Sequence, residues 1–325
     1  MSGDLKDKKR IDLREIFRAS LFIAIVLTTF IGLTACSSEE PYAEYENQTY
    51  FTGEGTLIQW SPGPFKDNPM ALLPDTDIKT LQPAELSILK DSTVIDHRNG
   101  CQWNYAVVLP SSYDQNPETT YPVIFLLHGL GVNYFDMALS AQKAYNWLLE
   151  KNRIPECILI TPDAGNSYYV DGYTEIDYET FFIREFVPRM ERRYRISKNK
   201  NERMLCGFSM GGYGATYYSF KYPEKFGYCY AMSGALDGKG TDTTPPVIEF
   251  INYKKPHPNP MVTLDIGNAD KFVNANGKFT NHLKVYGVAY EYILREGGHN
   301  WAFWRQGFFI AISRFASFME MNPIQ

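Results

Sequence analysis

The sequence has no excess of positive charge and few cysteines. Its 32 lysines and arginines are outnumbered by 37 acidic residues, which gives a formal net charge of -5 at pH 7. A chain of this composition lacks the basic surface on which nucleic-acid binding depends, so we exclude a nucleic-acid partner. The cysteines show no metal-ligand spacing, and the sequence contains no internal repeat or low-complexity segment. We therefore expect neither a metal ion nor another cofactor.

The length and composition indicate one globular catalytic domain. The chain has 325 residues, which suffices for one large α/β domain but not for two such domains with linkers. Hydrophobic residues make up 44% of the sequence and aromatic residues 15%, including 23 tyrosines and 21 phenylalanines. Such a composition supplies a full core and argues against disorder.

The first 35 residues are typical of a bacterial lipoprotein signal peptide. Six basic residues between positions 6 and 18 precede an apolar run at 21–33, which is short for a bilayer span. The run ends in Leu-Thr-Ala-Cys at 33–36, which resembles the lipobox after which cleavage leaves Cys36 as a lipid-modified N-terminus. The alternative is a plain transmembrane anchor. We expect an exported protein anchored through Cys36 to a bacterial membrane, namely the outer membrane, with the acidic tract at 37–40 favouring surface display.

Four further cysteines follow Cys36, and the sequence leaves their pairing open. Cys101, Cys157, Cys206 and Cys229 could form disulfides in an exported protein. The last three lie in apolar, strand-like stretches, where cysteine often serves as a small buried hydrophobic residue. This placement favours free, buried thiols.

The remaining chain divides into an irregular approach and a catalytic domain. Residues 36–83 are polar and proline-rich without a sustained period, which indicates a tether, and the domain spans 84–325. Strand-like stretches occur at 87–95, 102–110, 123–127, 157–161, 204–206, 226–232, 261–266 and 289–294. Helical patterns occur at 139–151, 178–194 and 213–221, and a final helix follows 301. Pro188 should kink or break the second helix. The alternation predicts an α/β fold with a doubly wound, mostly parallel sheet.

A glycine-flanked serine follows one of these strands. Gly-Phe-Ser-Met-Gly at 207–211 matches the G-x-S-x-G pattern, in which the serine occupies a sharp turn between a strand and a helix. The pattern alone is weak evidence, but here an apolar strand precedes it and a helix rich in small residues follows. Ser209 is therefore the predicted nucleophile.

A serine nucleophile needs a base and an acid further along the chain. Of the histidines after Ser209, His299 lies in a Gly-Gly-His loop after the last strand and is the predicted base. His257 lies in a proline-rich insertion, and His282 lies in a helix-like stretch, where we expect a surface histidine. Two aspartates are candidates for the acid. Asp270 lies beyond the end of the strand at 261–266, so its side chain can turn towards the histidine, and Asp265 within that strand is expected to be a structural hydrogen-bonder.

Two backbone N–H groups should stabilise the oxyanion of the tetrahedral intermediate. One belongs to Met210, the residue after the nucleophile, and the other to Leu130 in the glycine-bearing loop at 128–131. His128 precedes Ser209, contrary to the order in which triads of this kind run, so we expect it to brace that loop.

Five blocks in this order give the chain its resemblance to a known family. They are Tyr121 to Gly129, Pro162 to Ser167, Gly207 to Ala215, Gly267 to Asp270, and Gly297 to Trp301. Residues 85–320 resemble the putative-esterase family of the α/β-hydrolase superfamily, which includes esterase D, tributyrin esterases, and the feruloyl and acetyl-xylan esterases of carbohydrate esterase family 1. The resemblance implies the same triad and the same oxyanion donors.

The predicted function is hydrolysis of a carboxylic ester by a Ser-His-Asp triad through an acyl-enzyme. The substrate would be an acylated polysaccharide or a small ester, from which acetyl or feruloyl groups are removed. The alternatives are an acyltransferase or peptidase with the same fold, and a noncatalytic carbohydrate-binding lipoprotein. Candidate substrate-binding residues are Asn166, Tyr168, Tyr169, Trp301 and Trp304, and core packing is the equal alternative for each of them.

Overall fold

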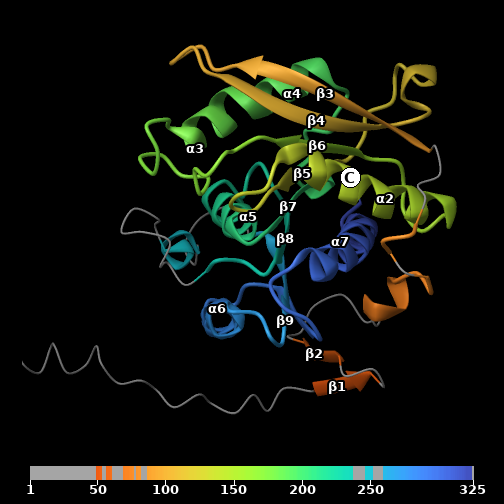
Figure 1. Cartoon of the computed structure of the whole chain (residues 1–325), viewed down its shortest axis with the longest axis vertical. Helices are drawn as coiled ribbons and strands as arrows, with labels where there is room; N and C mark the ends of the chain where they lie inside the picture. The colour runs from red at the N-terminus through yellow and green to blue at the C-terminus, as the bar shows by residue number, and fades with distance from the viewer. Residues whose placement is uncertain are drawn as a thin grey trace, which may run out of the picture. The chain divides into compact units, whose positions relative to one another are not determined.

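A computed structural model describes residues 49–52, 56–60, 69–76, 78–81, 86–236, 246–251 and 259–323. These residues form one mixed sheet, covered on both faces by helices (Figure 1). The strand order is β1-β2-β10-β9-β8-β7-β5-β6-β4-β3. The six strands from β10 to β6 run parallel, and an antiparallel pair extends the sheet at each end. The predicted α/β fold with a mostly parallel sheet is therefore confirmed.

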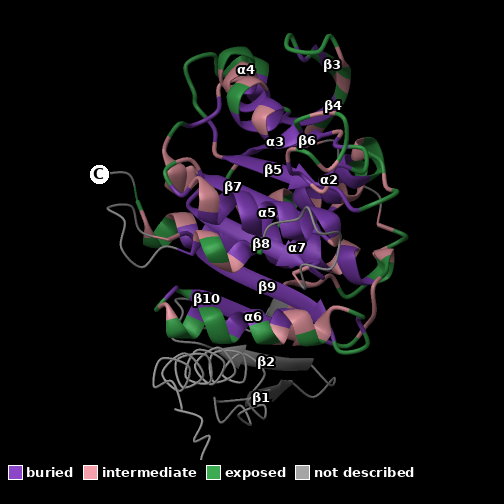
Figure 2. Ribbon diagram, turned by 90° about the vertical axis from the view of Figure 1, so that its left-hand side faces the viewer, coloured by how far each residue is buried: buried purple, intermediate pink, exposed green. Residues whose placement is uncertain are grey.

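The predicted strands all form. Their bounds are β3 Ser87–Ile95, β4 Gln102–Pro110, β5 Val123–Leu127, β6 Ile158–Pro162, β7 Arg203–Phe208, β8 Tyr228–Met232, β9 Met261–Gly267 and β10 Tyr290–Arg295. Every residue of β5, β6, β7, β8 and β9 is buried, and these strands lie in the middle of the molecule (Figure 2). Parallel strands with helices on both faces need apolar side chains on both sides, which explains their continuous apolar sequences.

The helices divide into two layers. On one face, α2 (Tyr134–Glu150) and α7 (Trp301–Met321) share a core cluster with the sheet, and Trp147 of α2 packs edge-on against Phe309 of α7 at 5.6 Å. The other face carries α5 (Met210–Lys221), α6 (Val273–Val285) and the helical segment from 178 to 193. Helix α2 begins five residues before the predicted 139 because Asn133 caps it, accepting a hydrogen bond from the Asp136 N–H at 2.7 Å.

The predicted helix at 178–194 is interrupted, as Pro188 indicated. It consists of α3 (Tyr178–Phe181), a π-helical turn η3 (Phe182–Phe186) and α4 (Val187–Arg193), with Pro188 in the first turn of α4. Proline has no backbone N–H and its ring crowds the preceding turn, so it is accommodated at the start of a helix. The three pieces pack their aromatic residues against the sheet as one amphipathic unit.

The sheet begins earlier in the chain than predicted. Strands β1 (Thr49–Thr52) and β2 (Thr56–Trp60) form a hairpin, and β2 pairs antiparallel with β10. Both lie within 36–83, where we expected only an irregular tether, so that prediction is wrong at these residues. The physical reason is that β10 would otherwise be an open edge, and pairing with a short hairpin satisfies its backbone groups. Residues 1–48, including the predicted signal peptide and Cys36, lie outside the described part.

The carboxyl ends of the parallel strands lie along one edge of the sheet, where the loops with the predicted site residues meet. Ser209 follows β7, Leu130 follows β5, Asp270 follows β9 and His299 follows β10. In open parallel sheets this edge is where ligands bind. Sheet topology therefore brings together residues that are 90 positions apart in the chain.

Candidate active site

Ser209 occupies a strained turn between β7 and α5. Its φ of 55° and ψ of -118° lie in a region that non-glycine residues rarely adopt. The turn is possible because its neighbours lack side chains. A Cβ atom at Gly211 would lie 1.8 Å from the Leu127 carbonyl oxygen, and one at Gly207 would lie 2.3 Å from the Gly211 carbonyl oxygen. The two glycines of the sequence motif are thus required by close backbone approach, and they leave Ser209 half-buried at the end of the strand.

His299 connects Ser209 to Asp270. The Ser209 Oγ lies 2.9 Å from His299 Nε2, and His299 Nδ1 lies 2.9 and 3.1 Å from the two carboxylate oxygens of Asp270. An ionised carboxylate can only accept hydrogen bonds, so the Nδ1–H donates to Asp270. This tautomer leaves the Nε2 lone pair free to accept the proton of the Ser209 hydroxyl.

Asp270 is 3% exposed and its environment keeps it ionised. Burial by itself raises the pKa of the carboxyl. Hydrogen bonds from His299, from the Phe272 N–H at 2.9 Å and from Ser233 outweigh burial and hold the pKa below its ordinary value of 3.8. A carboxylate that stays charged at neutral pH can orient the imidazole and stabilise its protonated form.

Aromatic rings hold His299 from two sides. The Trp304 ring meets the imidazole edge-on at 5.0 Å, and Phe272 does so at 5.3 Å. Trp304 is itself fixed, because it stacks on Phe208 at 4.3 Å and its Nε1–H donates to the Ser233 Oγ at 3.1 Å. These contacts position an imidazole whose own loop is rich in glycine.

The sequence did not identify Ser233 as part of the site. Its one signal was its place just after strand β8.

The two predicted oxyanion donors lie at the same edge of the sheet. Met210 is the first residue of α5, and N–H groups in the first turn of a helix have no acceptor within that helix. Leu130 lies in the loop after β5 and its side chain is 50% exposed. Met210 lies at the N-terminus of α5, which is the positive end of the helix dipole, so a negative charge that develops near its N–H is favoured.

The oxyanion loop is braced by buried hydrogen bonds. His128 is fully buried, and its Nε2 accepts a hydrogen bond from the Ala164 N–H at 2.8 Å while its Nδ1–H donates to the Gly129 carbonyl at 3.0 Å. The Asn166 Oδ1 accepts from the Gly131 N–H at 3.1 Å. His128 therefore braces the loop as predicted, and Asn166, which we expected to contact substrate, also supports this loop.

Asp265 belongs to a separate, buried ion pair in the middle of β9. It receives two hydrogen bonds from the Arg295 guanidinium, at 2.7 and 2.8 Å, and one from the Tyr230 hydroxyl at 2.9 Å. Arg295 is 1% exposed and Asp265 is fully buried. Asp265 is the structural hydrogen-bonder that we expected.

The candidate substrate-binding tyrosines differ in exposure. Tyr169 is fully buried, and its hydroxyl donates to the His128 carbonyl at 2.9 Å, so of its two predicted roles it has core packing and not substrate contact. Its aromatic ring fills the core between the loop and α5. Tyr168 is half-buried and packs against Tyr173 at 4.8 Å and Tyr213 at 6.3 Å, so it lines the surface beside the nucleophile helix.

The two tryptophans also differ. Trp304 is 6% exposed and lies behind His299, which makes it a support for the imidazole rather than a substrate platform. Trp301 is half-buried and contacts Phe208 at 5.1 Å and Trp304 at 5.7 Å. Trp301 thus remains available to a ligand.

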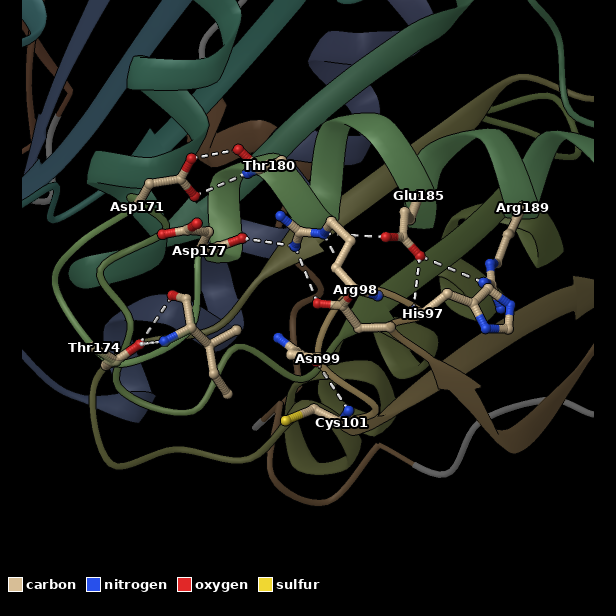
Figure 3. Close-up of polar contacts among 12 residues, drawn as sticks. His97, Arg98, Asn99, Cys101, Asp171, Thr174, Asp177, Thr180, Glu185 and Arg189 are labelled. Atoms are coloured by element: carbon tan, nitrogen blue, oxygen red, sulfur yellow. Dashed lines mark hydrogen bonds and ion pairs between the residues drawn. The ribbon is translucent and has the colours of Figure 1, made fainter.

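The loop that carries Tyr168 and Tyr173 is fastened at its far end by the hairpin between β3 and β4. Figure 3 shows Arg98 of that hairpin pointing to Glu185, whose carboxylate it contacts at 3.1 Å, and to the Asp177 carbonyl at the same distance. Asp171 accepts hydrogen bonds from the Thr180 N–H and hydroxyl, which closes the loop onto α3. These contacts give the wall of the site a fixed backbone.

Other predictions concern residues away from this site. All four cysteines from Cys101 onwards are free, and Cys157, Cys206 and Cys229 are buried. His282 lies on the exposed side of α6, and His257 is outside the described residues. Within the described ranges no group of three or more His, Cys, Asp or Glu side chains could hold a metal ion, and none of the helices found there is long and apolar enough to span a membrane.

Comparison with known proteins finds esterases among families, sequences and solved structures alike. The profile of the family described as "Putative esterase" matches residues 97–315, more than half of the chain. An acetyl esterase of Caldicellulosiruptor saccharolyticus is 25% identical over 56% of this chain and 79% of its own length. An endo-1,4-beta-xylanase/feruloyl esterase of Xylanibacter ruminicola is 24% identical over 62% of this chain but only 27% of its own length. The solved structure of a ferulic acid esterase superposes with a TM-score of 0.64 and 26% identity, covering 71% of this chain and 98% of that one.

Proposed function

Because the chain belongs to the putative esterase family and is a carboxylic-ester hydrolase, we propose that it works through a Ser209–His299–Asp270 triad and an acyl-enzyme. His299 Nε2 takes the proton of the Ser209 hydroxyl as the Oγ attacks the ester carbonyl carbon. The imidazolium then donates that proton to the departing alcohol. In the second half of the cycle, His299 takes a proton from water, the resulting hydroxide attacks the acyl-enzyme, and Ser209 regains its proton.

In this proposal the backbone N–H groups of Met210 and Leu130 stabilise the oxyanion formed in each half of the cycle. The buried hydrogen bonds of His128 support the loop that carries Leu130. Donors fixed in advance need no reorganisation when charge develops, and this is the main contribution that such a loop makes to the rate.

One observation carries the proposal, namely the unbroken row of hydrogen bonds from Ser209 Oγ through both imidazole nitrogens to Asp270. Each member comes from a different loop, and the serine occupies a strained backbone conformation. Structural hydrogen bonds rarely require such strain, whereas active sites often do.

The test is hydrolysis of p-nitrophenyl acetate. We expect Ser209→Ala to lower kcat by about 10⁴-fold or more, as removal of a triad member does elsewhere. Ser219→Ala is the matched control, because Ser219 is a buried serine of α5 whose hydroxyl contacts the Cys229 thiol and no member of the triad. Equal activity of both variants would refute the mechanism.

We propose that the natural substrates are acylated polysaccharides, or related small esters, from which acetyl or feruloyl groups are removed. The support comes from the relatives, whose names include acetyl esterase and feruloyl esterase. A rate comparison on acetylated xylan, methyl ferulate, tributyrin and a peptide tests this. Faster cleavage of the peptide or tributyrin would argue against a polysaccharide ester.

We also propose that the protein is exported, cleaved after residue 35 and held on a bacterial membrane through lipid at Cys36. The support is the sequence pattern at 1–36 alone. Metabolic labelling with a fatty acid tests it, because Cys36→Ser should abolish the label. Retention of the label would overturn the assignment.

A further inference from the structure

A hollow of about 420 Å³ is lined by residues of α2, of α7 and of the segment 78–81. We call it the α2–α7 hollow. Its walls are Ile78, Lys79, Asp136, Leu139, Ser140, Lys143, Trp301 and Arg305. Its volume would hold one or two sugar residues, which is within the usual size of a small-ligand site.

The hollow is built on rigid elements. The four residues from α2 lie at positions 136, 139, 140 and 143, which is the spacing of one face of a helix. Trp301 and Arg305 are four residues apart on α7 and likewise share a face. Because the core below fixes both helices, the six wall residues on α2 and α7 are in place before any ligand binds, which lowers the entropic cost of binding.

The hollow adjoins the proposed triad through Trp301. This residue lies two positions after His299, and its ring is 5.1 Å from Phe208, the residue before Ser209. A substrate whose ester group reaches Ser209 could therefore extend one of its two halves past Trp301 into the hollow.

The charge of the hollow is opposite to that of the whole chain. Three cations, Lys79, Lys143 and Arg305, and one carboxylate, Asp136, line the hollow, whereas the chain as a whole carries a net charge of -5. Asp136 is partly engaged already, since the Asn133 Nδ2–H donates to its carboxylate at 2.7 Å. The Arg305 guanidinium lies 5.6 Å from the Trp301 ring, so an aromatic face and a cation meet at one point.

An indole beside cations suits a sugar that carries a carboxylate. The C–H face of a pyranose packs against an aromatic ring, and a guanidinium binds a carboxylate with two parallel hydrogen bonds. Asp136 would oppose a doubly charged anion more strongly than a singly charged one. We propose that the α2–α7 hollow binds a hexuronate residue in the alcohol part of an acylated polysaccharide, an inference that rests on the proposed function.

Binding to the Ser209→Ala protein tests this without catalysis. The probes are a xylo-oligosaccharide carrying one glucuronic acid and an unsubstituted one of equal length, measured by calorimetry. We expect the acidic probe to bind about tenfold more tightly, since each exposed ion pair contributes up to about fivefold. Arg305→Gln with Lys143→Gln should reduce this preference to nearly one. Lys284→Gln, which removes an exposed cation of α6 on the opposite face of the sheet, should leave it intact.

Three results would overturn the assignment: equal affinity of the two probes, a preference retained in the double variant, or displacement of the acidic probe by inorganic phosphate at matched ionic strength. The last would identify a general anion site. Failure of the proposed function would instead appear as unchanged hydrolysis by Ser209→Ala, so the two failures are distinguishable. Lost binding preference together with Ser209-dependent hydrolysis would refute the hexuronate site alone.

Discussion

Asp265 and Asp270 are five residues apart, and each is paired with a basic side chain, yet their surroundings differ. Asp265 lies within β9 and is paired with Arg295, which is always charged and almost completely buried. Asp270 lies in the loop after β9 and is paired with His299, whose ring also reaches Ser209. The Arg295 guanidinium stays protonated and cannot accept a proton from a serine, whereas the imidazole of His299 can accept one and release it again.

The same contrast extends to the groups around each aspartate. A second buried pair lies near Asp265, where Arg314 donates to Glu291 at 2.9 Å between α7 and β10. Around Asp270 the neighbours are loops, Ser233 and two aromatic rings beside His299. The interior of the sheet thus contains buried ion pairs that connect its elements, and the strand ends contain the groups proposed for catalysis.

The comparison predicts its largest effect for Asp270→Asn. This change leaves the shape but removes the charge that orients and stabilises His299, so kcat for p-nitrophenyl acetate should fall by about 10⁴-fold, or about 5 kcal/mol. The melting temperature should fall less than in Asp265→Asn, because the asparagine oxygen can still accept hydrogen bonds such as that from the Phe272 N–H. A loss of less than tenfold would show that Asp270 is not the acid.

The same substitution five residues earlier should act on stability. Asp265→Asn leaves the buried Arg295 without a counter-charge, and breaking such a pair costs about 3–5 kcal/mol. We expect the midpoint of urea unfolding to fall accordingly, with kcat within about tenfold of the parent for the fraction that is folded. If kcat fell as far as in Asp270→Asn while stability held, the roles assigned to the two aspartates would be reversed.

A smaller effect concerns pH. Burial raises the pKa of Glu291 from 4.5 to about 7, although Arg314 opposes the shift. Between these values the folded protein holds a proton that the unfolded chain has released, so this carboxyl makes stability fall as pH rises from 4.5 to 7. The change is at most roughly 3 kcal/mol. The pH dependence of stability that Asp270 contributes has the opposite direction. Its lowered pKa adds stability that is lost only as pH falls below 3.8.

Glu291→Gln tests whether Glu291 makes stability fall as pH rises. The amide cannot ionise, so the free energy of unfolding should decline less between pH 5 and pH 8 than in the parent, as measured by urea titration at each pH. A decline of equal size in both proteins would show that Glu291 does not carry this pH dependence. The catalytic rate is not expected to follow it, since Glu291 is remote from the triad loops in the sheet.

Much of the site could be predicted because its chemistry fixes residue types and chain order. The G-x-S-x-G turn needs glycines for steric reasons, and the choice between Asp265 and Asp270 followed from where β9 ends. The kink near Pro188 followed from the missing N–H of proline. In each of these cases a local rule and the sheet topology lead to the same conclusion.

The rest depended on contacts that no local pattern encodes. Ser233 and Trp304 support Asp270 and His299 through a contact between residues 71 positions apart. Tyr169 resembles a surface aromatic in sequence but packs in the core. Its hydroxyl can be buried there because it donates a hydrogen bond to the carbonyl of His128. Strands β1 and β2 are short, and although their threonines and aromatic residues flank a Gly-Glu-Gly sequence typical of a hairpin, only the pairing of β2 with β10 shows that they extend this sheet.

The most direct test of the account is to identify the residue that a fluorophosphonate labels. The reagent forms a covalent adduct only with a serine that is activated by a base, and mass spectrometry of the digested protein locates the adduct. We predict a single adduct on Ser209, and its absence after Asp270→Asn under the same exposure. An adduct on another serine, or full esterase activity in protein whose Ser209 is fully labelled, would contradict the account.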